Sequence, residues 1–377
     1  MKVIPLYLPQ FHRIPENDAW WGEGFTEWVN VRSAKPLYEG HYQPRVPLNG
    51  NYYDLSEVET LRWQCKIARE HGIYGFCFYH YWFNGHLLLE KPMEMLLAHP
   101  EIETRYCVCW ANHDWTDAWK RKEGKEAVLI AHDFDDEADW DAHFNYLLPF
   151  FRDPRYMTED GCPLMLIYVP QLIGKIRRMT DRWIALAREN GLKGIKFVYQ
   201  SVSACIDHSW DRTNFAYGIQ FHPGYVMQYS SSAMRRALFS WMVRRARAIK
   251  RFLGIHQSVF GGPDKVRIYD YEEYWKRIVR LKPESDKMLP SAFVDWDNTP
   301  RKQQRGYVFQ GASPAVFGLY FKQLVERTRT VYHTDKIFVF AWNEWAEGGY
   351  LEPDERYGYA YLDAIKDALI ELKEWPE

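Results

Sequence analysis

Short apolar segments alternate with longer amphipathic ones along nearly the whole 377-residue chain. The apolar segments predict eight strands, at Val3–Leu8, Gly75–Tyr81, Arg105–Ala111, Leu164–Val169, Lys196–Gln200, Tyr217–Phe221, Ser291–Val294 and Lys336–Ala341. The amphipathic segments predict helices at Leu55–His71, Leu88–Ala98, Trp140–Phe151, Met179–Asn190, Ala233–Phe252, Pro314–Tyr332 and Tyr359–Leu372. Because strands that alternate with helices form parallel sheets, eight such repeats predict closure into a barrel.

The chain offers no obvious place for a domain boundary. It contains no flexible linker, low-complexity segment or internal sequence repeat. Barrels of alternating strands and helices run to about 250 residues or more as one unit. We therefore predict an α/β protein in which residues 1–377 form a single (β/α)8 TIM-type barrel, with long loops at its C-terminal face.

The charge and the aromatic content narrow the expected partners. The formal net charge is −2, so no overall basic field is present to attract nucleic acid. Aromatic residues make up 17% of the chain, and aromatic faces pack well against the apolar faces of sugar rings. A core rich in large residues would give the same composition.

The cysteines and the N-terminal sequence favour a reducing compartment. Cysteines occur at Cys65, Cys77, Cys107, Cys109, Cys162 and Cys205 without CxxC spacing, which indicates buried free thiols. The N-terminus lacks a cationic segment followed by an apolar run, and no apolar stretch reaches about 18 residues. We expect a cytoplasmic protein without a transmembrane segment.

Polar and aromatic residues gather where the predicted strands end. In a barrel of this kind, residues just past the carboxyl ends of the strands face a shared active-site mouth. The candidate substrate-binding residues are Gln10, His12, Tyr79, His80, Tyr81, Trp82, Trp110, Asn112, Asp114, Gln220, His222, Asp295, Trp296, Asp297, Asn343 and Trp345. Taken singly, each of them, the three histidines included, could instead be a packed and hydrogen-bonded structural residue.

Glu344 and Glu347 follow the last predicted strand at a spacing of three residues. A turn-like or helical path, which Gly348 and Gly349 make easy, leaves their Cβ atoms about 5 to 6 Å apart. Two carboxyls about 5 to 5.5 Å apart suit retaining glycoside hydrolysis, and their mutual repulsion favours one protonated acid near pH 7. The alternative is a pair that caps the next helix or bridges to arginines.

Six motifs between residues 6 and 354 occur in the order LPQFHRIPENDAWWGEGFTEWVNV, GHYQPRVPL, YGFCFYHYWFNG, CWANHDWT, WDNTPR and AWNEWAEGGYLEPD. With these motifs the chain resembles the WbsX-like family, whose members are named as glycosyltransferases of polysaccharide biosynthesis. That family is itself similar to the endo-α-mannosidases of glycoside hydrolase family 99. The first motif adds Trp28 to the candidate substrate-binding residues.

The resemblance implies a (β/α)8 barrel and a sugar-acting site in which Glu344 and Glu347 are catalytic. By this resemblance, Glu344 assists attack by the substrate's own 2-hydroxyl, which gives a 1,2-anhydro sugar. Glu347 then acts as acid and afterwards as base at the glycosidic oxygen. His113 and Asp114 depart from the family pattern, which tends to carry Glu-Asn after Trp-Ala-Asn, so a mannose substrate does not carry over.

Asp295 and Asp297, in the sequence VDWDN, resemble the paired aspartates that hold a metal and a nucleotide sugar in many glycosyltransferases. The chain lacks a glycine-rich nucleotide-binding turn, so hydrogen bonding to sugar hydroxyls is the favoured role. Ligation of a hard cation by their oxygens is the alternative. We predict no metal site and no cofactor.

The sequence thus predicts a carbohydrate-active enzyme that cleaves or transfers glycosidic bonds of a bacterial surface polysaccharide or its precursor. The chemistry would be of the glycosidase type, with an oligosaccharide or polysaccharide as partner. Two alternatives stay open. One is a glycosyltransferase of lipopolysaccharide or O-antigen biosynthesis that uses an activated sugar donor, and the other is a nonenzymatic glycan-binding barrel.

Residues 233–253 form a basic amphipathic segment without a single acidic residue. A helix of this kind can make peripheral contact with an anionic membrane. An outer barrel helix with a solvated basic face is the alternative.

Overall fold

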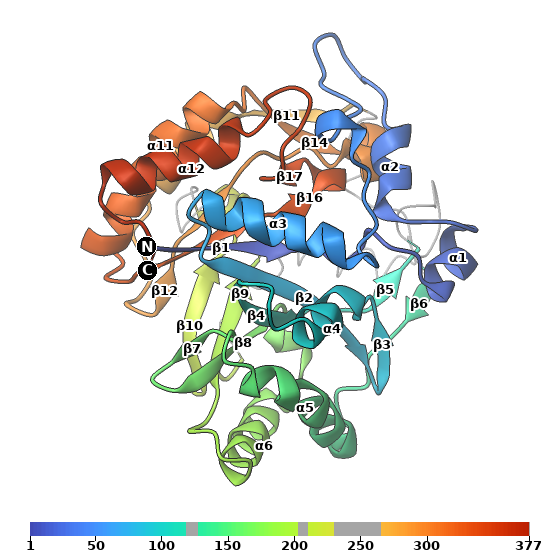
Figure 1. The fold of residues 1–377 in the computed structure, drawn as a ribbon, viewed down its shortest axis with the longest axis vertical. Coiled ribbons are helices and arrows are strands. Elements are labelled where there is room, and N and C mark those ends of the chain that lie inside the picture. Colours follow the sequence, from blue (N-terminus) through green and yellow to red (C-terminus); the bar gives the residue numbers. More distant parts are fainter. Residues whose placement is uncertain (118–126, 203–209, 230–264, 377) are drawn as a thin grey trace, which may run out of the picture.

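The computed structural model describes residues 1–117, 127–202, 210–229 and 265–376. Their parallel strands form a nearly closed barrel, and helices surround it (Figure 1). The barrel strands are β1 (Lys2–Tyr7), β2 (Gly75–Phe83), β4 (Arg105–Trp110), β8 (Cys162–Ile167), β9 (Lys196–Ser201), β10 (Phe215–Gln220), β12 (Met288–Leu289), β13 (Ser291–Phe293) and β15 (Lys336–Phe340). The predicted barrel and its strands are confirmed.

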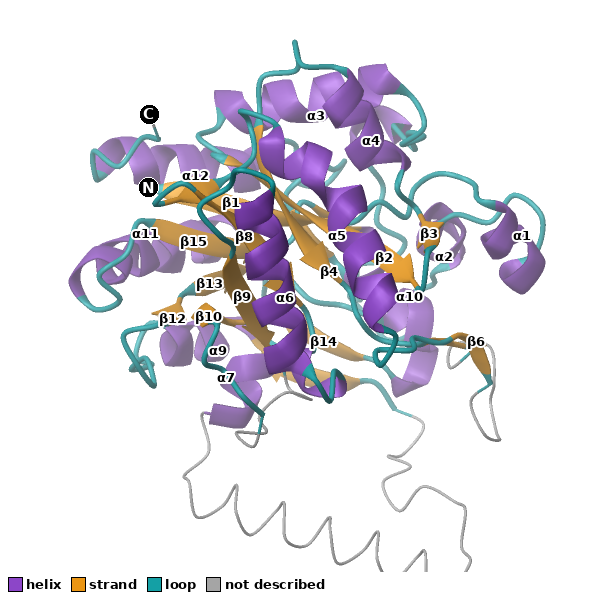
Figure 2. Ribbon diagram, turned by 90° about the horizontal axis from the view of Figure 1, so that it is seen from below, coloured by secondary structure: helices purple, strands orange, loops and turns teal. Residues whose placement is uncertain are grey.

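Helices from between the strands pack around the outside of the barrel, as Figure 2 shows for α3, α5, α6, α11 and α12. The predicted helices within the described residues are confirmed as α3 (Val58–Glu70), α4 (Lys91–Ala98), α5 (Glu137–Arg152), α6 (Ile176–Glu189), α11 (Pro314–Thr330) and α12 (Ala360–Glu371). Local chemistry sets where they begin. The side chain of Ser313 accepts a hydrogen bond from the Val316 N–H, and Pro314 occupies the first turn of α11. The predicted helix at 233–252 lies outside the described residues.

The barrel closes through one segment that Pro290 divides into two short strands. Residues of β12 pair with β10 through Gly218–Met288 and Ile219–Leu289. Residues of β13 pair with β15 on the other side, from Ser291 to Phe293. Because a proline has no N–H to donate to a ladder, the break between the two strands falls at Pro290.

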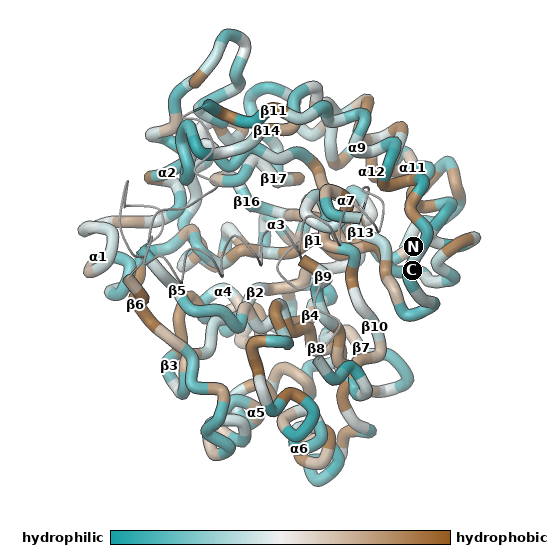
Figure 3. The backbone as a smooth tube through the Cα atoms, turned by 180° about the vertical axis from the view of Figure 1, so that it is seen from behind, coloured by the Kyte–Doolittle hydropathy of each residue, from teal (hydrophilic) through white to brown (hydrophobic). Residues whose placement is uncertain are grey.

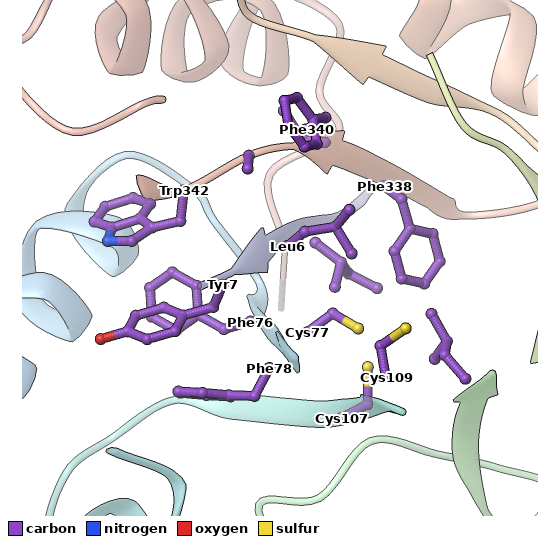
Figure 4. Close-up of a cluster of buried hydrophobic side chains, with 14 of the residues drawn as sticks. Leu6, Tyr7, Phe76, Cys77, Phe78, Cys107, Cys109, Phe338, Phe340 and Trp342 are labelled. Atoms are coloured by element: carbon purple, nitrogen blue, oxygen red, sulfur yellow. The ribbon is translucent and has the colours of Figure 1, made fainter. Parts of the chain in front are cut away.

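Large apolar side chains fill the barrel, as Figure 4 shows for residues of β1, β2, β4 and β15. Hydrophobic stretches lie along β4 and β8, whereas α6, α11 and α12 alternate between hydrophobic and hydrophilic positions (Figure 3). Such patterns are typical of strands buried on both faces and of helices with one buried side. Cys65, Cys77, Cys107 and Cys109 are buried and free, as predicted, and Cys162 is free and half-buried.

Long connections carry short elements around the barrel ends. The helices among them are α1 (Pro15–Trp21), α2 (Glu27–Ser33), α7 (Gly224–Tyr229), α9 (Tyr271–Ile278) and α10 (Thr299–Lys302). The short strands are β3 (His86–Leu88), β5 (Trp115–Thr116), β6 (Val128–Ile130), β7 (Thr158–Glu159), β11 (Arg267–Asp270), β14 (Tyr307–Gln310), β16 (Asn343–Glu344) and β17 (Gly349–Tyr350). Across the described ranges, no helix combines the length and apolarity needed to cross a bilayer.

Candidate active site

A cavity of about 350 Å³ opens where the carboxyl ends of the barrel strands meet. It lies where the active sites of (β/α)8 enzymes are found. Its lining residues are Leu8, Gln10, Asn17, Trp21, Phe25, Glu27, Tyr79, Tyr81, Ala111, His113, Asp114, Trp115, Thr116, Tyr168, Phe221, Trp296, Arg301, Phe340, Glu344 and Glu347. The sequence-predicted candidates among them are Gln10, Tyr79, Tyr81, Asp114, Trp296, Glu344 and Glu347.

A tight hairpin presents the two glutamates to this cavity. Glu344 ends β16, a single 3-10 turn covers Trp345–Glu347, and Gly349 begins β17. Residues three apart lie on the same side of a 3-10 turn, so Glu344 and Glu347 face the same space. Gly348 ends the turn with a φ of 70°, and a Cβ there would lie 2.9 Å from the Asp297 backbone nitrogen. Only glycine fits this position without strain.

Arg301, on α10, bridges the two glutamates. Its Nη2 lies 3.0 Å from Glu344 Oε1, and its Nη1 lies 3.1 Å from Glu347 Oε1. A third carboxylate, Glu27 at the start of α2, lies 3.1 Å from the same Nη2. One buried guanidinium therefore holds three carboxylates from separate parts of the chain.

The environment of Glu344 favours its protonated form. Burial, followed by the negative charges of Glu347 and Glu27, raises the pKa of Glu344 to about 8, although Arg301 acts in the opposite direction. Glu347 is more accessible, with 19% of its side chain exposed against 4% for Glu344. The two carboxyls thus differ in environment, which is a common way to separate acid and base roles.

A buried network supports the hairpin from behind. The carboxylate of Glu352 accepts hydrogen bonds from Trp345 Nε1 at 2.7 Å, from the Tyr53 hydroxyl at 2.8 Å and from Gln64 Nε2 at 2.7 Å. The candidate Trp345 therefore lies outside the cavity lining, as does Trp28, which packs against it at 5.6 Å between ring centroids. Both tryptophans fix the hairpin in place.

Asp295 and Asp297 follow β13, but both are buried and neither lines the cavity. Asp295 pairs with Arg45 Nη2 at 2.7 Å. Asp297 accepts hydrogen bonds from Gln43 Nε2 at 2.7 Å and from the Thr299 hydroxyl at 2.6 Å, and it contacts His41 Nε2 at 2.8 Å. Burial alone would raise the pKa of Asp297, but the contact with His41, the charge of Arg45 and the hydrogen bond from Thr299 lower it. Both carboxylates are occupied by protein groups.

Side chains along β2 point alternately to its two faces, and this separates four adjacent candidates into two sets. Tyr79 and Tyr81 line the cavity, whereas His80 and Trp82 point to the opposite face, toward α5. His80 Nε2 lies 2.9 Å from His143 Nε2, and Trp82 stacks on the same imidazole at 4.7 Å. Successive side chains of a strand alternate between faces, so His80 and Trp82 do not reach a ligand in the cavity.

Amide side chains extend the sheet at two strand ends. Asn112 exchanges two hydrogen bonds of 2.8 Å with the backbone of Val169. Asn343 does the same with Leu8, at 2.8 and 2.9 Å. Each side chain thus continues the hydrogen bonding between neighbouring strands past their ends. These candidates position the loops that follow rather than line the cavity.

The remaining candidates are buried outside the lining. Gln220 accepts a hydrogen bond from the Tyr332 hydroxyl at 2.8 Å, and Trp110 packs edge-on against His143 at 4.7 Å. Burial lowers the pKa of His12 to about 4 and that of His222 to about 3. Neutral, enclosed imidazoles do not suit the proton-shuttle role that the sequence left open.

Glu27 and Arg301 are the main residues of the cavity that sequence reasoning missed. Both lie within motifs of the family resemblance, GFTEWVN and WDNTPR, which was the available signal. Within the described ranges, no cluster of three or more His, Cys, Asp or Glu side chains has the arrangement of a metal site.

A (β/α)8 barrel with paired carboxylates in an aromatic cavity at its strand ends is an arrangement typical of carbohydrate-active enzymes. Residues 3–365 match the model of the family described as Glycosyltransferase WbsX, and the chain belongs to this family. The resemblance inferred from the motifs is confirmed. The description of this family names a carbohydrate-active enzyme.

The curated relatives are proteins named Uncharacterized protein WxcX from two strains of Xanthomonas campestris pv. campestris. Each is 35% identical over 370 residues, which is 97% of this chain and 49% of the relative. The chain thus spans about half the length of the curated relatives it matches.

Solved structures share the fold at low sequence identity. The GH99 endo-alpha-mannosidase from Bacteroides thetaiotaomicron matches with a TM-score of 0.54 and 12% identity, over 99% of this chain and 97% of that one. A structure described as a glycoside hydrolase-like protein matches with a TM-score of 0.51 and 14% identity, over 88% and 91% of the two chains. These likenesses concern the fold alone.

Proposed function

We propose that this chain cleaves or transfers glycosidic bonds through Glu344 and Glu347, on a bacterial surface polysaccharide or its precursor. The observation that carries the proposal is the pair of glutamates held by Arg301 in a cavity lined by aromatic side chains. Trp296 supports a sugar ligand as well. Its side chain lines the cavity, and aromatic faces pack well against the apolar faces of sugar rings.

The roles of the two glutamates are taken from the family resemblance. Glu347 is the more accessible carboxyl and would give a proton to the glycosidic oxygen and take one back from the incoming acceptor. Glu344 is deeper and would accept a proton from the substrate's own hydroxyl, with Arg301 stabilising its carboxylate. Burial raises the pKa of Glu344 to about 8, so its base role requires the ionised form, which Arg301 stabilises and which a rise in pH increases.

A glycosyltransferase that uses a nucleotide sugar is the second candidate, because the family is described in those words. The contacts of Asp295 and Asp297 weigh against the metal-dependent form of that chemistry. Arg45, Gln43 and Thr299 already satisfy these carboxylates, so a metal would have to displace protein partners.

Mass spectrometry of products tests the proposal. The chain is incubated with a panel of bacterial oligosaccharides, with and without nucleotide sugars. We expect shortened or rearranged glycans without any donor, and none from Glu347→Gln. Glu326→Gln, on the exposed face of α11, is the matched control and should retain activity.

Two other outcomes have definite meanings. Elongation only in the presence of a nucleotide sugar would replace the proposal with the transferase alternative. Binding of a glycan with no turnover by the wild-type chain, and equal affinity in Glu347→Gln, would make the barrel a carbohydrate-binding protein.

A further inference from the structure

The ionisable groups of the cavity are unbalanced in charge. Among the described lining residues, carboxylates come from Glu27, Asp114, Glu344 and Glu347, and a guanidinium comes from Arg301 alone. His113 also lines the cavity, but burial lowers its pKa, so it adds no positive charge at pH 7. Even with one carboxyl protonated, the negative groups outnumber the positive one.

The charge of Arg301 is already used within the protein. Its guanidinium lies within 3.1 Å of carboxylate oxygens of Glu27, Glu344 and Glu347. Its Nη2 also donates to Gln10 Oε1 at 3.3 Å. An anionic ligand would have to compete with three fixed carboxylates for this guanidinium.

We infer that the sugar ring beside Glu344 and Glu347 is neutral or carries an amine, and that sugars with a carboxylate or phosphate are excluded from this position. The inference rests on the proposed function and specifies its substrate class. Like charges placed in a partly buried cavity repel strongly, because little water is present to screen them. An ammonium group on the sugar would instead be attracted.

The same charge distribution disfavours a sugar diphosphate donor. Proteins bind diphosphates through lysine, arginine, metal ions or open helix N-termini. The described part of the lining offers Arg301 for this purpose, and that residue is enclosed by carboxylates. Transfer from a glycosidic bond fits the cavity better than transfer from a nucleotide.

Glu27 is the residue that sets this selectivity without being one of the proposed catalytic pair. Its Oε2 lies 3.2 Å from Arg301 Nε and 3.1 Å from Arg301 Nη2. Replacing this carboxylate with an amide would leave a fraction of the guanidinium charge available to a ligand. Glu27→Gln should therefore weaken the discrimination against anionic sugars.

Ligand-observed NMR with matched monosaccharides tests the inference. Each set contains a methyl glycoside, the corresponding 2-amino sugar and the corresponding uronic acid, in the gluco, manno and galacto configurations. Uridine diphosphate glucose is added as a donor probe. In the set that binds best, we expect the uronic acid to bind at least about tenfold more weakly than the neutral sugar. In Glu27→Gln this ratio should fall several-fold, whereas Glu326→Gln should keep it.

The inference fails if a uronic acid or the nucleotide sugar binds as tightly as the neutral and amino sugars. It also fails if no neutral or amino sugar binds at the highest soluble concentration, or if Glu27→Gln leaves the ratio unchanged. Binding needs no turnover, so the result is independent of the product analysis. Charge selectivity without any product would leave this inference standing and remove the proposed chemistry.

Discussion

The indole N–H of Trp345 donates a hydrogen bond of 2.7 Å to the buried carboxylate of Glu352. Trp345 is the residue after Glu344, so this bond fixes the start of the turn that carries the glutamate pair. The ring of Trp345 also stacks on Tyr350 at 3.7 Å between centroids. The carboxylate of Glu352 and the ring of Tyr350 therefore hold the turn in place through Trp345.

Glu352→Gln should destabilise the protein by about 2 kcal/mol at pH 8. An amide keeps one acceptor oxygen and places an N–H₂ group among three donors, so at least one buried donor loses its partner. Urea denaturation measures the effect. The exposed Glu326→Gln should change the free energy of unfolding by less than about 0.5 kcal/mol. Equal stability of the two variants would contradict the prediction.

Glu344→Gln should change how stability depends on pH. The pKa of Glu344 is raised from 4.5 to about 8, so the folded state keeps a proton that the unfolded chain releases. The free energy of unfolding of the native protein therefore falls as pH rises from about 4.5 to 8. The variant lacks this contribution, and its stability relative to wild type should rise across that interval. Thermal melts from pH 5 to 9 that run parallel for the two proteins would show the prediction to be wrong.

Arg301→Met should cost about 3 to 5 kcal/mol, because it leaves the buried carboxylates of Glu27 and Glu344 and the partly buried carboxylate of Glu347 without a counter-charge. Adding Glu27→Gln removes one of these carboxylates and should recover at least about 1 kcal/mol. Chemical denaturation of both single variants and the double variant gives the coupling energy. Strict additivity would mean that Arg301 and Glu27 do not act as a pair.

Tyr81→Phe and Trp82→Phe should separate function from stability in adjacent residues. Tyr81 lines the cavity, and its hydroxyl accepts a hydrogen bond from Gln10 at 3.1 Å. Removal of this hydroxyl in Tyr81→Phe should lower kcat/KM about tenfold with little change in stability. Trp82 bonds to Asp139 at 2.9 Å on the outer face, so its replacement should lower stability by about 1 kcal/mol and leave kcat/KM unchanged. The reverse pattern would refute the assignment of the two faces.

The sequence predicted the strands well because parallel barrel strands are short, apolar and buried on both faces. The strand that begins at Ser291 was predicted, but the short strand β12 just before it was not, because two residues before Pro290 give no periodic signal. The set of residues predicted to line the cavity was too broad. A list of residues near strand ends ignores the alternation that turns His80 and Trp82 outward.

Arg301 and Glu27 illustrate what a single sequence does not reveal. They are far apart along the chain, and neither follows a barrel strand directly. Their contact depends on how the loops fold over the barrel, which residue types and spacing do not specify. The turn through Glu344 and Glu347 was predictable because both residues and the following glycines are local in sequence.

The segment that closes the barrel at Pro290 is also the one that delivers Arg301. Past β13 the chain passes through Asp297, whose side chain accepts from the Thr299 N–H at 3.0 Å, and enters α10. The pairing of β12 with β10 extends over two residues on each side, which makes it one of the shortest pairings in the barrel. Separation there would leave β13 paired with β15, so Arg301 and the two glutamates, which follow these two strands, would stay together on the same side of the opening.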